Sequence, residues 1–439
     1  MDSGILVSLA QRIHIDRGER LMSDSNAYEM RVKRINDAVA LREPDILPVI
    51  PKAVGAQYVL GGAGSSHRSE FYDFDKALEA SVNYHREFQP DVRYLPDILS
   101  GRANEIAQSA MIDWPGRPGT KVPNNSSYQF IEQEFMAQEE YDELLFDFTG
   151  FMFRKYIPRA FPGLKGFEGL NLLTSNILGT KLFAPLVNPG MKTALKNMLD
   201  VIEESEKAGE YLARCDNELD KLGFPSLNTS GGEVPFDIIS DFFRGTMGMF
   251  EDFLEIPEKV SEACEMLVSA QIYGWKSYIS GDMPIKRVFF PLHKGMDGFM
   301  SPKQYDTLYW KPFQKILRHL IGHGATPIIY TEGPYRTRVD YIREKLLEFP
   351  AGSCIIHFED GDFAEIKEKF EGIACVSGGM SLYLLEWGTK QQVVDRVKYL
   401  VDNCAAGGGF LLNSAGSIEN VKRENYEAMF DTARTYGKK

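Results

Sequence analysis

The stretch Pro327–Tyr335, which reads PIIYTEGPY, decides the fold class. Three apolar residues lead to Tyr330, and Glu332 then stands directly before a Gly-Pro turn. A short apolar run that ends at Gly and Pro is typical of a buried strand. A carboxylate at the end of such a strand is costly to bury unless it has a partner or a function. Glu332 is therefore the first candidate site residue.

Outward from this stretch, apolar runs alternate with amphipathic segments from about residue 285 to the end of the chain. Residues 305–324 and 390–405 have apolar side chains at helical spacing, which predicts helices. Strands that are apolar throughout and are each followed by a helix indicate a parallel sheet covered on both faces. We predict an α/β fold that closes into a (β/α)8 TIM barrel. The expected strands here are KRVFFPLH (286–293), TPIIYTE (326–332), SCIIHFE (353–359), IACVSGG (373–379) and GFLLNS (409–414).

The first half of the chain is less regular. Strand one of the barrel is expected at DILPVIP (45–51) and strand two near DVRYL (91–95). Residues 1–25 are interpreted as an N-terminal extension and residues 26–439 as the barrel domain. Within that domain, Gly, Pro and Asn turns followed by aromatic-rich helical segments predict a largely helical insertion or lid over residues 97–222.

Composition excludes several classes of protein. The chain has 439 residues and a net charge of -13, which disfavours nucleic acid or an anionic membrane surface as a partner. No apolar run reaches the length of a membrane span, and the N-terminus lacks the features of a secretory signal, so we expect a cytoplasmic protein. Its five cysteines are widely spaced, which indicates neither a disulfide framework nor a thiolate zinc site.

Polar residues stand at the carboxyl ends of the predicted strands, where barrels of this kind carry their chemistry. Three consecutive strands end in His293, Glu332 and Glu359. One imidazole and two carboxylates at one mouth could hold Zn²⁺ or a similar divalent ion. His357 lies two positions before Glu359 on the same strand face and is a reserve ligand. An alternative for Glu359 is to cap the helix that follows it.

Aromatic residues also gather near these strand ends. Phe289, Tyr330 and Tyr335 could line an apolar pocket for a ring, and Asn413 stands at the end of the last strand. We interpret these four as candidate substrate-binding residues, although barrel cores use such aromatic side chains too.

Several segments resemble the uroporphyrinogen decarboxylase superfamily from about residue 26 to the end. They include YDFDKALEASVNYHREFQPD (72–91), FFRGTMGMFEDFLEIPEKV (242–260) and the tail ENYEAMFDTARTYG (424–437). FFPLHKGMDGFMS (289–301) and YTEG (330–333) are similar to the branch found in corrinoid-dependent demethylases. Members of that branch move a methyl group from a methoxylated aromatic compound to a corrinoid protein. The resemblance implies the same TIM barrel.

Two departures narrow the function that this resemblance implies. The decarboxylases carry arginine-rich segments after strand one, whereas residues 48–62 offer one lysine and no arginine. The thiol-methylating relatives carry H-x-C-G where this chain has Tyr330 to Gly333, and a further cysteine near the last strand, where this chain has LLNSAGS. Glu and His make a harder site than thiolates, suited to polarising oxygen.

The sequence thus predicts the substrate-side methyltransferase of an O-demethylation reaction. Glu332, His293 and Tyr330 are the catalytic candidates, and a metal ion or a proton from one of these groups would stabilise the leaving phenolate oxygen. A D-x-H-x-x-G corrinoid loop is absent, so the corrinoid is expected on a separate partner protein. Three alternatives stay open: a decarboxylase, a corrinoid methyltransferase acting on a thiol or an amine, and a non-catalytic barrel that binds a tetrapyrrole or corrinoid. Homo-oligomerisation also stays open.

Overall fold

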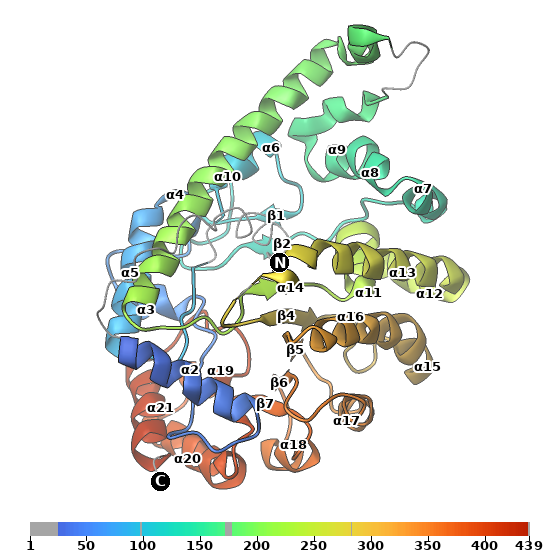
Figure 1. Cartoon of the computed structure of the whole chain (residues 1–439). Helices are drawn as coiled ribbons and strands as arrows, with labels where there is room; N and C mark the ends of the chain where they lie inside the picture. Colours follow the sequence, from blue (N-terminus) through green and yellow to red (C-terminus); the bar gives the residue numbers. More distant parts are fainter. Residues whose placement is uncertain (1–24, 97–98, 172–177, 282, 438–439) are drawn as a thin grey trace.

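The central element is a six-stranded parallel sheet with the strand order β3-β4-β5-β6-β7-β8 (Figure 1). The computed structural model describes residues 25–96, 99–171, 178–281 and 283–437, so nearly all of the predicted N-terminal extension lies outside the described residues. The strands are β3 (Ser230–Gly231), β4 (Arg287–Leu292), β5 (Thr326–Thr331), β6 (Ile355–Phe358), β7 (Cys375–Met380) and β8 (Phe410–Ser414).

The βα alternation predicted for the second half is confirmed. All five strands expected after residue 285 are observed as β4 to β8, and each is followed by at least one helix. Every residue of β6, β7 and β8 is buried, because helices cover the sheet. The helices of this half are α15 (Pro302–Gln304), η6 (Tyr305–Trp310), α16 (Lys311–Gly322), α17 (Val339–Leu346), α18 (Phe363–Lys369), α19 (Leu382–Glu386), α20 (Lys390–Leu400), η7 (Val401–Ala405) and α21 (Arg423–Tyr436).

The two strands predicted in the first half are reduced to single bridges. Val49 pairs in parallel with Leu412 of β8, and Arg93 pairs in parallel with Ser226. The backbone N–H of Asp91 donates to the carbonyl oxygen of Val49 at 3.0 Å, so the two segments also touch each other. Pro48 lies beside this bridge and has no N–H to donate, which prevents a longer ladder there.

The helices of the first half and the middle lie around this sheet (Figure 1). Before β3 they are α2 (Ser25–Val39), α3 (Ala56–Gly61), α4 (Ser69–Tyr72), α5 (Phe74–Phe88), α6 (Gly101–Ala107), η1 (Gln138–Glu140), α7 (Tyr141–Phe146), α8 (Phe148–Phe151), η2 (Met152–Tyr156), α9 (Ile157–Ala160), η3 (Pro162–Gly169), η4 (Gly179–Leu186) and α10 (Pro189–Lys221). Between β3 and β4 they are α11 (Pro235–Asp237), η5 (Ile238–Arg244), α12 (Gly245–Glu255), α13 (Pro257–Gly274) and α14 (Lys276–Ser280). A two-stranded antiparallel pair, β1 (Ile112–Asp113) and β2 (Gln129–Phe130), interrupts the helical segment over residues 97–222. None of the described helices is long and apolar enough to cross a membrane.

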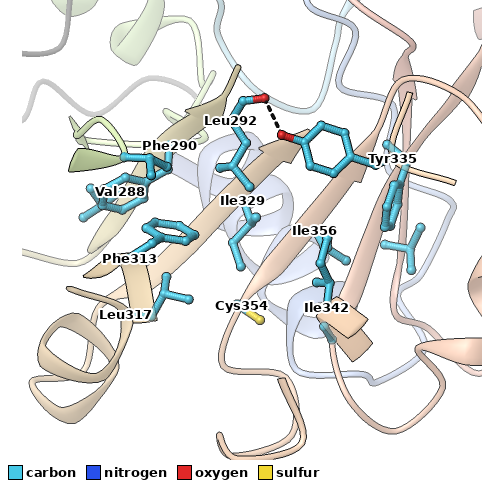
Figure 2. Packing of buried hydrophobic residues seen from close by; sticks show 14 of the residues in the cluster. Val288, Phe290, Leu292, Phe313, Leu317, Ile329, Tyr335, Ile342, Cys354 and Ile356 are labelled. Carbon is cyan, nitrogen blue, oxygen red and sulfur yellow. Dashed lines mark hydrogen bonds between the residues drawn. The ribbon is translucent and has the colours of Figure 1, made fainter. Parts of the chain in front are cut away.

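One face of the sheet packs against the helices that follow the strands. Figure 2 shows Phe313 and Leu317 of α16 beside Ile329 of β5, with Ile342 of α17 beside Ile356 of β6. These side chains are at most 1% exposed, so this layer supplies much of the apolar area that stabilises the fold.

The other face of the sheet has a separate apolar cluster. It contains one residue from each of four strands, together with residues from the segments that form the single bridges: Ile50, Val92, Ile328, Ile355, Cys375 and Leu411. Side chains two positions apart on a strand point to the same face. Tyr330, His357, Ser377 and Asn413 therefore form the next layer above this cluster, toward the carboxyl ends of the strands.

We predict that Arg244→Met lowers the free energy of unfolding by about 3–5 kcal/mol. Arg244 Nε donates to Asp252 Oδ2 at 2.5 Å and Nη2 to Asp252 Oδ1 at 3.0 Å, and both side chains are at most 1% exposed. The substitution leaves the Asp252 carboxylate buried, and among the described residues the Tyr141 hydroxyl, at 2.7 Å, is its remaining side-chain donor. Urea denaturation measures the change. Arg318→Met serves as the control, because it breaks an ion pair with Glu348 whose side chains are 56% and 43% exposed. We expect this variant to lower the free energy of unfolding by less than about 1 kcal/mol. Equal losses in the two variants would contradict the role of the buried pair.

Candidate active site

Three polar side chains meet where β4, β5 and β6 end. Leu292 pairs with Thr331, and Thr331 pairs with Phe358, so the residues that follow these strands lie next to one another. His293 and Glu332 are neighbours, with 3.4 Å between His293 Nε2 and Glu332 Oε2. Two of the predicted site residues are therefore in contact, and Glu359 follows on the next strand.

The His293 imidazole is fixed by two aspartates that come from another part of the chain. Its Nδ1 lies 2.6 Å from Asp241 Oδ2, and its backbone N–H donates to Asp237 Oδ2 at 2.9 Å. Burial by itself would lower the pKa of His293, but the hydrogen bond with Asp241 and the negative charges of Asp237 and Glu332 outweigh it and raise the pKa to about 9. His293 is therefore a cation at neutral pH.

Both aspartates were missed by the sequence analysis. Asp237 ends α11 and Asp241 lies on η5, four residues later, which puts both on the side of these helices that faces the end of β4. Asp241 also lies 3.1 Å from Lys294 Nζ, so one carboxylate holds two cations. The usable signal was the spacing of these two acids by one helical turn, directly after the segment NTSGGEVPF (228–236).

Glu233 is a third acid that the sequence analysis did not select. It follows β3, and its Oε2 atom is buried without a hydrogen-bond partner among the described residues. Burial raises the pKa of Glu233, and the nearby charges of Asp237 and Asp241 raise it further, while His293 acts in the opposite direction. A buried carboxyl group with a raised pKa beside a cationic histidine is a common feature of catalytic sites.

Tyr330 forms an aromatic wall next to these charges. Its ring stacks on His357 with 4.2 Å between centroids, and the Phe289 ring lies 5.3 Å away. Lys52 Nζ lies over the Tyr330 ring, 4.4 Å from its centroid. The Tyr330 hydroxyl donates to Glu359 Oε1 at 3.2 Å. Tyr330 thus lies beside Lys52 and Glu359, and Phe289 beside Lys52, while their roles in substrate binding and catalysis stay predictions.

Glu359 is held from two sides. Its Oε1 accepts from Tyr330, and its Oε2 accepts from the backbone N–H of Gly333 at 2.8 Å, which the turn conformation of Gly333 (φ +82°) makes available. Burial raises the pKa of Glu359, and the Glu332 charge adds to this. The alternative role of Glu359 as a helix cap is wrong, because Asp362 caps α18 by accepting from Ala364 N at 3.0 Å.

His357 and Asn413 belong to a chain of hydrogen bonds inside the sheet. Asn413 Nδ2 donates to Ser377 Oγ at 3.2 Å, and Ser377 Oγ lies 3.2 Å from His357 Nδ1. His357 Nε2 lies 2.9 Å from the carbonyl oxygen of Ala415, so it carries the proton and donates. Burial lowers the pKa of His357 to about 3, which keeps the ring neutral. Both ring nitrogens have partners, so His357 has no nitrogen to spare as the reserve metal ligand.

Tyr335 lies in the core rather than at the site. It is 1% exposed, and its hydroxyl donates to the carbonyl oxygen of Leu292 at 2.9 Å (Figure 2). The turn at Gly333 and Pro334 directs the chain back so that this ring packs beneath the end of β4. The tyrosine therefore positions the strand end, and its predicted contact with substrate is not part of this arrangement.

The predicted metal ligands do not form a ligand cluster. Within the part of the chain that the structure describes, no three or more His, Cys, Asp or Glu side chains are arranged to hold a metal ion. His293 Nδ1 is committed to Asp241, and both oxygens of Glu359 accept hydrogen bonds from within the protein. The set of His293, Glu332 and Glu359 is therefore not arranged to hold a zinc ion in this structure.

Comparisons with known proteins bear on the fold. No protein-family model and no curated protein matches the chain. A solved methyltransferase from Methanosarcina mazei is similar, with a TM-score of 0.55 over 92% of this chain and 98% of that chain. The two chains share a fold. At 12% sequence identity, the likeness extends to the fold alone.

We predict that elemental analysis of the purified protein gives no stoichiometric zinc, and that dialysis against EDTA leaves its thermal stability unchanged. The physical reason is that, among the residues that the structure describes, no three His, Cys, Asp or Glu side chains are arranged to hold a metal ion. Glu332→Gln is the matched variant, because it removes one proposed ligand without changing its size. One equivalent of a divalent ion in the wild type, lost in Glu332→Gln, would contradict this expectation and support the metal site.

Proposed function

We propose that this protein is the substrate-side methyltransferase of an O-demethylation reaction, which moves a methyl group from a methoxylated aromatic compound to the Co(I) of a separate corrinoid protein. The observation that carries the proposal is the arrangement of His293, which lies 2.6 Å from Asp241 and 3.4 Å from Glu332. The aromatic rings of Tyr330 and Phe289 lie at the same strand ends. The shared fold with a methyltransferase and the resemblance of FFPLHKGMDGFMS (289–301) to demethylases support it.

We further propose that the sheet closes into a TIM barrel. The segment around Val49 would join β8 to the segment around Asp91, which in turn meets the chain just before β3. The separate apolar cluster supports this closure, because Ile50 and Val92 pack there together with residues of β5 to β8. A closed barrel would gather every strand end at one mouth, where enzymes of this fold carry their active sites.

The chemical problem in demethylating an aryl methyl ether is the leaving group. A phenolate leaves poorly unless its oxygen receives a proton or a strong hydrogen bond as the bond to carbon breaks. A phenol has a pKa of about 10, as the tyrosine side chain does. A general acid works best when its own pKa is close to that of the group it protonates and near the working pH. His293, with its pKa raised to about 9, meets that requirement.

The proposed step balances without a further reactant. The corrinoid of the partner protein would supply, from its reduced cobalt, the electron pair that accepts the methyl group. The bond between the methyl carbon and the ether oxygen breaks, and its electron pair stays on the oxygen. The proton on His293 Nε2 moves to that oxygen, so a neutral phenol leaves. Asp241 stays hydrogen-bonded to Nδ1 and keeps the ring oriented throughout.

Before substrate binds, Glu332 is the partner of the His293 Nε2 atom. Its carboxylate lies 3.4 Å from His293 Nε2 with a side chain that is 38% exposed, so it can turn toward solvent when the ether oxygen takes its place. After the phenol leaves, Glu332 would relay a proton from water back to His293. The carboxylate at the end of β5 thus has an acid–base role in place of a ligand role.

We predict that methyl transfer from a methoxybenzene to a reduced corrinoid protein falls as the pH rises through about 9. The raised pKa means that the His293 cation is present below this pH and is lost above it. His293→Gln should lower kcat by about 10²–10⁴-fold and remove this pH dependence. His323→Gln changes an exposed histidine at the end of α16 and serves as the control.

The same assay separates the alternatives. Transfer from a thiol or an amine, with no transfer from any aryl ether in a broad panel, would favour another methyltransferase class. Release of CO₂ from a tetrapyrrole carboxylate would favour a decarboxylase. Full activity of His293→Gln on an aryl ether would contradict the acid mechanism while leaving methyl transfer intact.

A further inference from the structure

The long helix α10 has one covered face and one bare face. It begins far from the sheet and runs back toward it (Figure 1). Met191 and Ala194 on its inner side are at most 1% exposed and pack against Leu164 and Phe167 of η3. The side of the helix next to this covered face is exposed, and its large apolar residues belong to none of the apolar clusters formed by the residues that the structure describes.

Three large apolar residues lie along that bare side. Leu195 is 42% exposed, Leu199 61% and Ile202 46%. Their spacing of four and then three residues places them in one stripe along the helix, which is the spacing that packs one helix against another. We call Leu195, Leu199 and Ile202 the α10 stripe.

Charged residues border the α10 stripe in a particular order. Lys192 and Lys196 precede Leu199, whereas Glu203 and Glu206 follow it, and all four are exposed. Lys207 pairs with Glu204 along the same helix at 2.6 Å, yet none of these four charges has an ion-pair partner among the residues that the structure describes.

We propose that the α10 stripe is a dimer interface, on which α10 of a second copy of this chain lies antiparallel. A two-fold axis beside Leu199 exchanges the two ends of the helix pair. A residue at a given distance before Leu199 then faces the residue at about the same distance after it. Leu199 meets its own copy, and Leu195 meets Ile202 of the other chain.

The charges beside the α10 stripe favour a second copy of this chain as the partner, and they favour the antiparallel orientation. In the antiparallel pair, Lys196 faces Glu203 and Lys192 faces Glu206, and the symmetry makes each contact twice. A parallel pair would set lysine against lysine and glutamate against glutamate, which is unfavourable. A surface whose charges complement their own two-fold copy fits a second copy of the same chain better than an unrelated partner.

The first test measures the mass of the full chain against its concentration by sedimentation equilibrium. A contact of one helix pair is small, so we expect a monomer–dimer equilibrium with a dissociation constant on the order of micromolar. Leu199→Glu should weaken the dimer by more than tenfold, and Leu254→Glu, at a 68% exposed site on α12, should leave it unchanged.

Charge reversal tests the orientation. Lys196→Glu alone should weaken the dimer, and the double variant Lys196→Glu with Glu203→Lys should restore it, because both antiparallel contacts are rebuilt with their signs exchanged. These two residues are seven positions apart on one helix, too far for a direct pair within the chain, so restoration reports a contact between chains.

A cross-link gives an independent test. In Leu199→Cys, the new thiols of the two copies face each other, so mild oxidation should give a covalent dimer. The five native cysteines are buried and add little background. Leu254→Cys is the control and should stay monomeric on a denaturing gel.

A chain that is monomeric at all concentrations and forms no dimer through position 199 would overturn the proposal. So would a monomer in which Leu199→Glu abolishes binding of a corrinoid protein, since that would assign the stripe to a different partner.

Discussion

The hydrogen bond between Asp241 Oδ2 and His293 Nδ1, at 2.6 Å, is the interaction on which the site depends. An imidazole enclosed at the end of a strand would ordinarily lose its proton, because burial disfavours the charged form. Asp241 reverses this, with help from Asp237 and Glu332, and makes His293 a cation at neutral pH. Without that positive charge, the buried carboxylates of Asp237 and Asp241 would have less positive charge near them to offset their own negative charges. The cation and the acids around it therefore hold one another in place.

The sheet explains why these groups meet. Parallel strands carry their carboxyl ends to one edge, so His293, Glu332 and Glu359 follow three neighbouring strands. Beneath them, alternate side chains form two layers, an apolar cluster and the polar layer that contains Tyr330 and His357. The His357 ring in the polar layer already has its hydrogen bonds within the protein, since both of its nitrogens have partners. Glu332, which is 38% exposed and can change its partner, lies beyond this polar layer, after the end of β5.

The sequence was sufficient to predict β4 to β8, because each is a continuous apolar run followed by an amphipathic helix. Prediction was poorer for the segments at Val49 and Arg93, where single bridges replace strands. Proline beside Val49 removes the donor that a ladder needs, and apolar content alone does not reveal this. For the site, the prediction that residues at the ends of neighbouring strands lie together was correct for His293 and Glu332. Asp237 and Asp241 were missed because they lie on short helices after the two-residue strand β3, where no periodic pattern marks the end of a strand. The predicted metal ligands are not arranged as a ligand cluster within the described residues, and spacing along the sequence does not report that three-dimensional arrangement.

The charge state of His293 is the central claim, and it can be measured without knowing the substrate. Titration of the protein with isotope-labelled histidine by NMR follows the ring signals of each histidine, and His293→Gln assigns the signal of interest. The account predicts a pKa of about 9 for His293 and a clear fall in Asp241→Asn, in which the carboxylate that holds Nδ1 loses its charge. A pKa at or below the ordinary value of 6.5, unchanged in Asp241→Asn, would contradict it.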